Sequence, residues 1–186
     1  ENLLPEGRLR DLIAFRDRID PRDTWALLIR HGQDTAGALS LIPEGFDVAT
    51  EEILVPLARE SLQEKIEASR ARNLPLMASW EEIRMSLAGA QEKLGLRIDA
   101  NGAMFLPEGS APSTHIVKPE NASADFPHCP ANEFFCMRLA HELKVPVPAV
   151  GLLHLPEPLY VIERFDRVPL EQNAEKVAGT TRSEER

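Results

Sequence analysis

Apolar residues at helical spacing dominate the first part of the chain. Four of them fall close to one helical face: Leu9, Leu12, Ile13 and Ile19. Pro21 ends this first helix, because proline lacks the N–H that a helix interior needs. Asp23 or Thr24 can cap a second helix, and Gly32 suits its C-terminal end. The sequence therefore predicts two short helices before residue 33.

The next segment mixes short apolar runs with one longer helix. Residues 36–42 and 53–55 predict strands, and residues 59–70 predict a helix. Pro56 separates the second strand from the helix, because it would clash with a preceding helical turn. Residues 73–75 have the composition of a boundary.

From residue 83 the pattern favours strands. Residues 94–98 alternate apolar and other side chains, Asp99–Gly102 is a turn signal, and residues 104–106 return as a partner strand. A third strand is predicted over 114–118. A helix over 132–144 carries an apolar stripe made of Phe135, Cys136, Leu139, Ala140 and Leu143. Two more strands are predicted over 149–155 and 159–165.

These elements predict an α+β fold. The order of three strands, one helix and two strands is the plan of a kinase small lobe, although many α+β domains share it. We expect a small N-terminal α/β subdomain over residues 1–75, and a kinase-like small lobe, an antiparallel sheet with one helix, over 76–167. Residues 168–186 are polar and predict a loose tail.

Charge and composition narrow the function classes. The net charge of −9 argues against a broad nucleic-acid-binding surface, and six early arginines are matched by six early acidic residues. No stretch reaches the ~18 continuous apolar residues of a membrane span. Two cysteines cannot form a disulfide framework, so a cytoplasmic location is expected. The chain begins with Glu1, which suggests a piece of a longer protein.

Three runs could carry chemistry, and each has a plain structural alternative. The small residues from Ser86 to Lys93 could bring backbone amides close to a phosphate, or form an ordinary turn. Lys118 at a strand end could hold phosphates and pair with Glu133, or each could be a solvated surface charge. The backbone of residues 163–165 could bind an adenine edge, or be a charged strand end.

A metal site is not expected. His128, Cys129, Cys136 and His141 are the candidate ligands, but Cys136 and His141 are five positions apart, about 140° around a helix. Cys136 fits the apolar stripe better.

Taken together, the runs resemble the HipA family, the toxin kinases of bacterial toxin–antitoxin pairs. The resemblance is carried, in order, by Asn2–Pro5, Gly37–Pro43, Ser86–Lys93, Pro112–Pro119, Asn132–Ala140, Leu143–Pro148 and Glu163–Arg167. Matches in this order are more specific than any single motif.

The resemblance implies an ATP site and a regulatory serine. The implied ATP-binding residues are Ala88, Gly89, Ala90, Gln91, Glu92, Lys93, Lys118, Glu163, Arg164 and Phe165. The first six would form a phosphate-facing loop, and the last three an adenine-contacting hinge. Glu133 would be the partner of Lys118, and Ser86 the site of autophosphorylation.

The resemblance also implies a reaction and partners. The parent protein would use Mg-ATP to phosphorylate a protein serine or threonine, with a translation component such as glutamyl-tRNA synthetase as substrate. A HipB-like helix-turn-helix antitoxin would inhibit it and provide any contact with DNA. The chain lacks the family's Asp-Gly-His-x-x-Asn stretch, which belongs to a helical second lobe. We therefore expect that lobe and the catalytic base to be missing, and no turnover by this chain alone. The alternative is an inactive split or truncated module that binds protein partners.

Overall fold

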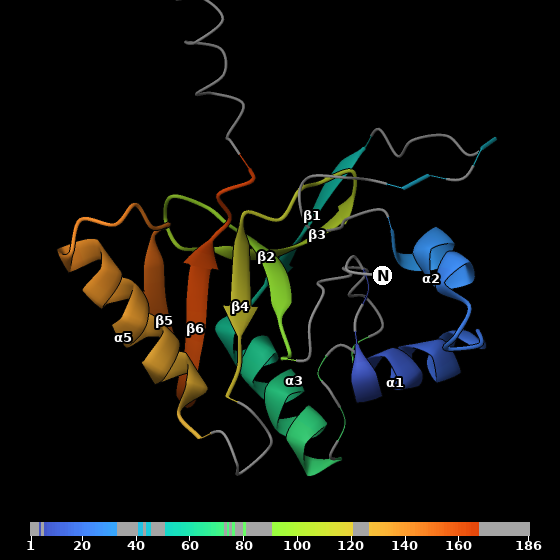
Figure 1. Ribbon diagram of the computed structural model, residues 1–186, viewed down its shortest axis with the longest axis horizontal. Helices are drawn as coiled ribbons and strands as arrows, with labels where there is room; N and C mark the ends of the chain where they lie inside the picture. The colour runs from blue at the N-terminus through green and yellow to red at the C-terminus, as the bar shows by residue number, and fades with distance from the viewer. Residues whose placement is uncertain are drawn as a thin grey trace, which may run out of the picture.

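The computed structural model describes residues 4, 6–32, 41–42, 44–45, 51–72, 74, 76, 80, 91–120 and 127–167 (Figure 1). Within these ranges the helices are α1 (Gly7–Asp17), α2 (Thr24–His31), α3 (Arg59–Ala71) and α5 (Cys129–Glu142). The strands are β1 (Glu52–Leu57), β2 (Leu94–Ile98), β3 (Met104–Gly109), β4 (His115–Lys118), β5 (Val150–Leu155) and β6 (Glu157–Glu163). The strand predicted over 36–42 and the tail over 168–186 fall mostly or wholly outside the described residues.

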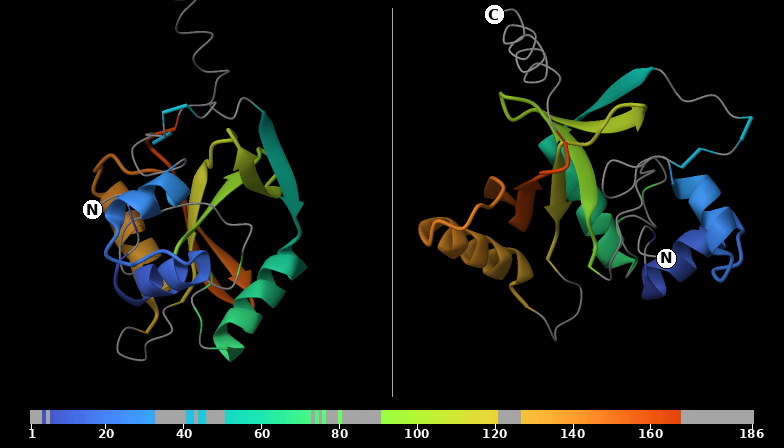
Figure 2. Two further views of the ribbon diagram at one scale, coloured as in Figure 1. Left: turned by 90° about the vertical axis from the view of Figure 1, so that its right-hand side faces the viewer. Right: turned by 45° about the horizontal axis from the view of Figure 1, so that its top comes forward.

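All six strands join one antiparallel sheet in the order β1-β3-β2-β4-β6-β5. The sheet twists, so that its two ends face different directions in the two views of Figure 2. The turn predicted between β2 and β3 is confirmed: the Asp99 carboxylate accepts hydrogen bonds from the backbone N–H groups of Asn101 and Ala103. Gly102 has φ +80°, which glycine adopts without strain.

Strand β1 lies at an edge of the sheet and contains Pro56. Its whole length pairs with β3, with Pro56 opposite Phe105. Proline has no backbone N–H to donate to a ladder, so within a sheet it is tolerated mainly on edge strands. The strand predicted over 53–55 is confirmed, but it continues through Pro56 to Leu57, so Pro56 lies within β1 and does not separate the strand from the helix.

The main core lies between the sheet and helix α3. It is built from residues of α1, α3 and the six strands, together with two residues outside these elements, Leu76 and Trp80. The members are Leu9, Ile13, Leu57, Leu62, Ile66, Leu76, Trp80, Leu94, Leu96, Met104, Leu106, Val117, Leu155 and Leu159. Leu62, Leu96 and Leu159 are fully buried. The α+β class with an antiparallel sheet is thus confirmed.

The core crosses the boundary predicted at residues 75 and 76. Strand β1 and helix α3 precede that boundary, yet β1 extends the sheet and α3 contributes Leu62 and Ile66 to the main core. A second, smaller cluster joins Leu4, Ala14 and Leu27. The division into two units at this point remains a prediction.

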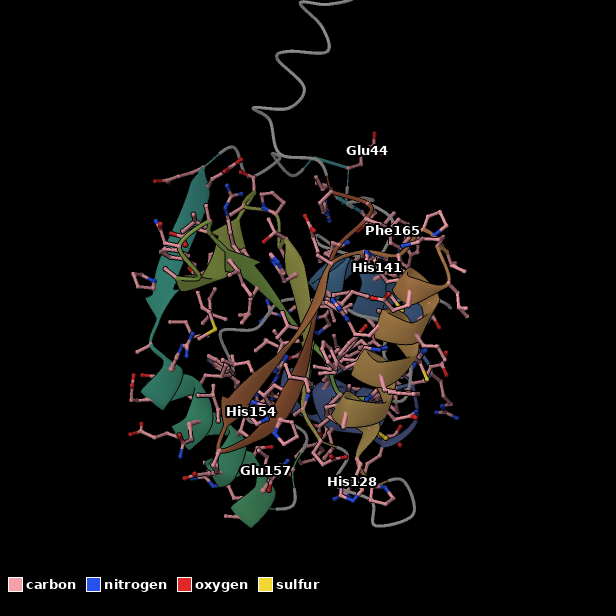
Figure 3. The ribbon with its side chains drawn as sticks, turned by 90° about the vertical axis from the view of Figure 1, so that its left-hand side faces the viewer. Glu44, His128, His141, His154, Glu157 and Phe165 are labelled. Atoms are coloured by element: carbon pink, nitrogen blue, oxygen red, sulfur yellow. The ribbon has the colours of Figure 1, made fainter. Side chains whose placement is uncertain are left out.

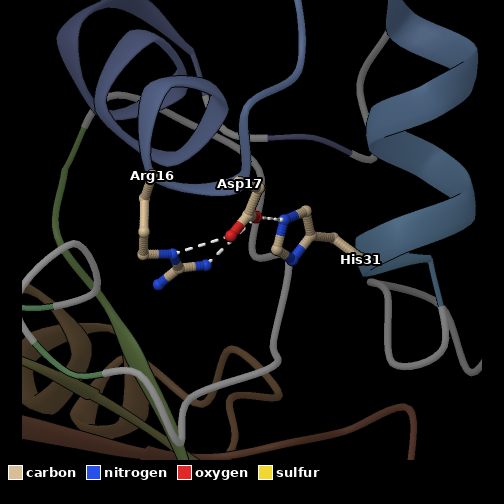
Figure 4. Close-up of polar contacts among 3 residues, drawn as sticks. All are labelled: Arg16, Asp17 and His31. Carbon is tan, nitrogen blue, oxygen red and sulfur yellow. Dashed lines mark hydrogen bonds and ion pairs between the residues drawn. The ribbon is translucent and has the colours of Figure 1, made fainter.

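Helices α1 and α2 are joined by a partly buried polar cluster (Figure 4). Two guanidinium nitrogens of Arg16 donate to the Asp17 carboxylate, and Nε2 of His31 lies 2.6 Å from Asp17 Oδ2. Burial lowers the pKa of His31, and the bond to Asp17 offsets this only in part. Burial alone would raise the pKa of Asp17, but its bonds to Arg16 and His31 together lower it. The cluster therefore holds the two helix ends together with a neutral imidazole at neutral pH.

Helix α5 covers β5 and β6, and it corrects two predictions (Figure 1). It begins at Cys129 rather than at 132, because Pro130 suits the first turn, and Lys144 with φ +63° ends it. Its predicted apolar stripe is not buried: Phe135, Leu139 and Leu143 are 65%, 48% and 69% exposed. Helical spacing alone did not reveal which face of α5 the sheet covers.

No helix among the described residues is long and apolar enough to cross a membrane.

Candidate functional site

Lys118 and Glu133 form the centre of the candidate site. Lys118 is the last residue of β4, an inner strand of the sheet, and Glu133 lies in the first turns of α5. The Lys118 Nζ donates to Glu133 Oε2 at 2.5 Å, and about a quarter of each side chain is exposed. The strand end and the helix start thus place a cation and an anion in contact at the rim of the sheet. The predicted pairing of these two residues is present as a contact, while its role towards a nucleotide stays a prediction.

The ring of Tyr160 lies beneath the ammonium group of Lys118. Tyr160 stands directly opposite Lys118 in the register of β4 and β6, and the Lys118 Nζ lies 5.6 Å from the centre of its ring. An ammonium over an aromatic face is attracted by the ring's quadrupole. Tyr160 is 1% exposed, and burial together with the charge of Glu133 raises its pKa to about 12. The ring therefore stays neutral and supports the ammonium of Lys118.

A second ammonium group, that of Lys93, stands close to this pair. Burial lowers the pKa of Lys93, the positive charge of Lys118 lowers it further, and the negative charges of Glu133 and Glu6 act in the opposite direction. The register of β2 and β4 sets Leu94 opposite Val117, which brings the adjoining residues Lys93 and Lys118 to neighbouring positions. Glu6, at the N-cap position of α1, acts on Lys93 as a second negative charge. The described site thus gathers two ammonium groups and two carboxylates, and an anionic ligand would interact favourably with the ammonium groups of Lys93 and Lys118.

The predicted phosphate-facing loop is only partly described. Ser86, Ala88, Gly89 and Ala90 lie outside the described residues. Gln91 is described, and its side-chain nitrogen is buried without a hydrogen-bond partner among the described residues. A buried amide donor normally has a partner, so this nitrogen is a candidate ligand contact.

Glu92 faces the protein backbone. Its carboxylate accepts a hydrogen bond from the Leu76 N–H at 3.2 Å, and burial raises its pKa. This contact ties the start of β2 to residue 76, and it gives Glu92 a structural role whatever it does towards a nucleotide.

The segment Glu163–Arg167, named here the hinge segment, begins at the last residue of β6. Glu163 and Phe165 are exposed, Phe165 by 87%, whereas Arg164 between them is 4% exposed. Figure 3 shows Phe165 at the same end of the molecule as His141 of α5. The predicted strand over 159–165 therefore ends at Glu163, and Phe165 is not a core residue.

The Arg164 side chain is directed inward. Its guanidinium donates twice to the Asp166 carboxylate, at 2.9 and 2.5 Å, and once to Ser113 Oγ at 2.8 Å. Sequence reasoning did not single out Ser113 or Asp166 as partners of Arg164. Burial does not alternate strictly along β6, where the adjacent Leu159 and Tyr160 are both buried, so strand alternation gave no clear signal that Arg164 lies inside.

Comparisons with known proteins agree on one family. Residues 1–42 match the HipA N-terminal domain, and residues 85–184 match the HipA-like C-terminal domain. The chain is 36% identical over 175 residues to the serine/threonine-protein kinase toxin HipA of Shewanella oneidensis, covering 92% of this chain. It is 37% identical over 171 residues, 89% of this chain, to Y4mE of Sinorhizobium fredii, which is named as a candidate kinase.

The chain spans 38% and 40% of the length of these two relatives. The first domain match covers the N-terminal helices, and the second covers more than half of the chain, including the candidate site. The chain belongs to the HipA family of kinase-like proteins.

Proposed function

We propose that this chain contains the nucleotide-binding small lobe of a HipA-type protein serine/threonine kinase. The observation that supports it is the Lys118–Glu133 ion pair at the end of an inner strand, with Lys93 close to both charges. In kinases a strand lysine held by a helix glutamate contacts the phosphates of ATP. Membership of a family that includes a named kinase toxin points the same way.

Several described residues support a nucleoside triphosphate as the ligand. Lys118 and Lys93 would neutralise phosphate charge, and the buried Gln91 nitrogen would donate to a phosphate oxygen. The backbone of residues 163–165 would take the adenine edge, and the exposed ring of Phe165 would pack on the base. Residues 86 and 88–90 would complete the phosphate loop.

The described residues do not fit a magnesium ion by themselves. They contain no group of three or more His, Cys, Asp or Glu side chains that could hold a metal. Mg²⁺ would reach this site bound to the triphosphate, whose oxygens are its preferred ligands.

Phosphoryl transfer would belong to the full length of such a protein. The chain has no Asp-Gly-His-x-x-Asn stretch to supply a base, and a general base contributes ~10²–10⁴ in rate. The purified 186-residue chain is expected to bind ATP without turnover; steady transfer of labelled phosphate to any protein would contradict this.

The family also suggests a substrate, an inhibitor and a location for the proposed kinase. The substrate would be a serine or threonine of a translation component such as glutamyl-tRNA synthetase. A HipB-like antitoxin would inhibit the protein and mediate contact with DNA, in the cytoplasm. Phosphorylation of Ser86 would add negative charge to the phosphate-facing loop and compete with ATP.

The nucleotide proposal is tested by calorimetry with Mg-ATP on the wild-type chain and on Lys118→Ala. Loss of a charge-assisted contact predicts at least ~10-fold weaker binding. Arg138→Ala is the matched control, because it removes one positive charge from an exposed position on α5. Equal affinities for wild type and Lys118→Ala would refute the proposal.

A second candidate is a protein-binding module without chemistry. Phe135, Leu139 and Leu143 are exposed, and their spacing of four positions places them along one side of α5. A contiguous exposed apolar patch of this kind favours a protein-interaction surface, whereas single exposed apolar residues do not. This candidate predicts no response to Mg-ATP, and loss of antitoxin binding in Phe135→Asp.

A further inference from the structure

Arg164 is buried beneath the hinge segment. Its side chain is 2% exposed and that of Asp166 is 17% exposed. The planar guanidinium makes a two-pronged contact with Asp166 and a separate hydrogen bond to Ser113, which is itself fully buried. A fork–fork contact of this kind fixes orientation as well as distance.

The backbone of the same segment is anchored on both sides. The Arg164 N–H donates to the Thr114 carbonyl at 2.8 Å, and the Glu163 N–H donates to the Ala149 carbonyl at 2.9 Å. The Arg164 side chain then ties residue 166 to residue 113, which precedes β4. Arg164, directly after β6, is thus hydrogen-bonded through its backbone and its side chain to the two residues that precede β4.

Because Arg164 faces the interior, its neighbours face outward. Glu163 and Phe165, on either side of it, are exposed. A ligand that reaches the outer side of this segment would meet the backbone and Phe165, and would not meet the guanidinium.

We infer that Arg164 is a positioning residue: through Asp166 and Ser113 it holds the backbone of residues 163–165 in the geometry that an adenine edge requires. This rests on the proposed nucleotide site. Hydrogen bonds to a rigid base weaken steeply when donor and acceptor angles change, so a loosened segment would lose base recognition first. Phosphate contacts at Lys93 and Lys118 lie on other elements and would be retained.

The test uses Arg164→Lys in the full 186-residue chain, with Arg138→Lys as control. Lysine keeps the charge and the aliphatic stem but cannot form the fork. Two ligands are titrated by calorimetry: Mg-ATP, and inorganic tripolyphosphate with Mg²⁺, which has no base. We expect Arg164→Lys to bind Mg-ATP about tenfold more weakly and tripolyphosphate within about twofold of wild type.

Hydrogen–deuterium exchange of residues 163–167 without ligand gives an independent measurement. Faster exchange there in Arg164→Lys, and not in Arg138→Lys, is expected if the fork fixes the segment. Ser113→Ala should show the same selective loss to a smaller degree, and it serves if Arg164→Lys does not fold.

Three outcomes overturn the inference. Equal loss of Mg-ATP and tripolyphosphate binding would mean a general effect on stability. Unchanged Mg-ATP affinity with unchanged exchange would mean that the fork does not position the segment. Absence of Mg-ATP binding by the wild-type chain would refute the proposed function and the adenine role together, and exchange would still show whether Arg164 fixes the segment.

Discussion

Lys118 and Glu133 are 15 positions apart in the chain, and their ion pair joins the last residue of β4 to the first turns of α5. Between them lie residues 121–126, outside the described residues, and Pro130 in the first turn of α5. The contact is therefore a tertiary one, and it sets where α5 begins relative to the sheet. Lys93 adds a second ammonium to the same place.

Replacing Glu133 by glutamine should destabilise the nucleotide-free chain. The change removes the charged partner of the Lys118 ammonium and one of the negative charges acting on Lys93, which we expect to cost ~1–2 kcal/mol because the Lys118–Glu133 pair is only partly buried. The melting temperature should fall by ~2–8 °C. Differential scanning fluorimetry measures this, with the exposed Glu142→Gln on the same helix as control. Equal melting of Glu133→Gln and wild type would contradict the prediction.

The single tyrosine of the chain makes its titration directly visible. Tyr160 should ionise with a pKa of about 12 in the folded chain and near 10.0 in denaturant, followed by absorbance at 295 nm. Since the folded pKa is the higher one, the stability due to neutral Tyr160 is present below pH 10 and is lost as the pH rises towards 12. Glu133→Gln should lower the folded pKa, because the Glu133 charge contributes to the shift. A folded pKa near 10 would contradict the prediction that burial and the Glu133 charge raise the pKa of Tyr160.

Acid should weaken the α1–α2 cluster through His31. Its folded pKa lies below the ordinary value of 6.5, so the stability that depends on the neutral ring is present above that value and is lost as the pH falls through the folded pKa. Asp17, with a pKa below 3.8, adds a loss only at much lower pH. Arg16 and Arg30 are the other charges acting on the ring, and both oppose its protonation.

His31→Gln removes this titration and keeps a side-chain donor. Between about pH 8 and pH 5 its melting temperature should vary less than that of wild type, measured by circular dichroism. Exposed His154 provides the matched His→Gln control. Parallel pH profiles of wild type and His31→Gln would exclude the imidazole as the titrating group.

Three glycines should differ in their tolerance of alanine. A Cβ on Gly109, which has φ +64°, would collide with the Glu51 carbonyl oxygen. Gly102 has φ +80° but open space around it, and Gly151 has open space and no left-handed φ. Alanine should therefore cost most at Gly109, ~1 kcal/mol at Gly102, and little at Gly151. Urea unfolding of the three variants measures the order, and a different order would contradict it.

Local patterns predicted much of the fold. Asp23 caps α2 through a bond from the Ala26 N–H, and α3 spans Arg59–Ala71 where residues 59–70 were expected. The Asp99–Gly102 turn was recognisable because its signals are short-range. Each of these depends on residues within a few positions of one another.

Features set by distant contacts were not predicted. The pairing of β1 with β3 joins residues about fifty positions apart, and no local pattern specifies it. The face of α5 was misjudged, because apolar spacing shows a stripe but not what covers it. The contact of the Arg164 side chain with Ser113, 51 positions away, was not predicted either.

Pro56 also affects how one copy of this chain meets another. Among the described residues β1 has no strand on its outer edge, and its Ile53, Leu54 and Val55 are each more than a third exposed, which is the kind of edge that invites a strand from a second molecule. A proline on an edge strand opposes such pairing, because it offers no N–H to a ladder. Substitution of this one imino acid would therefore be expected to raise the tendency of the chain to self-associate through its sheet.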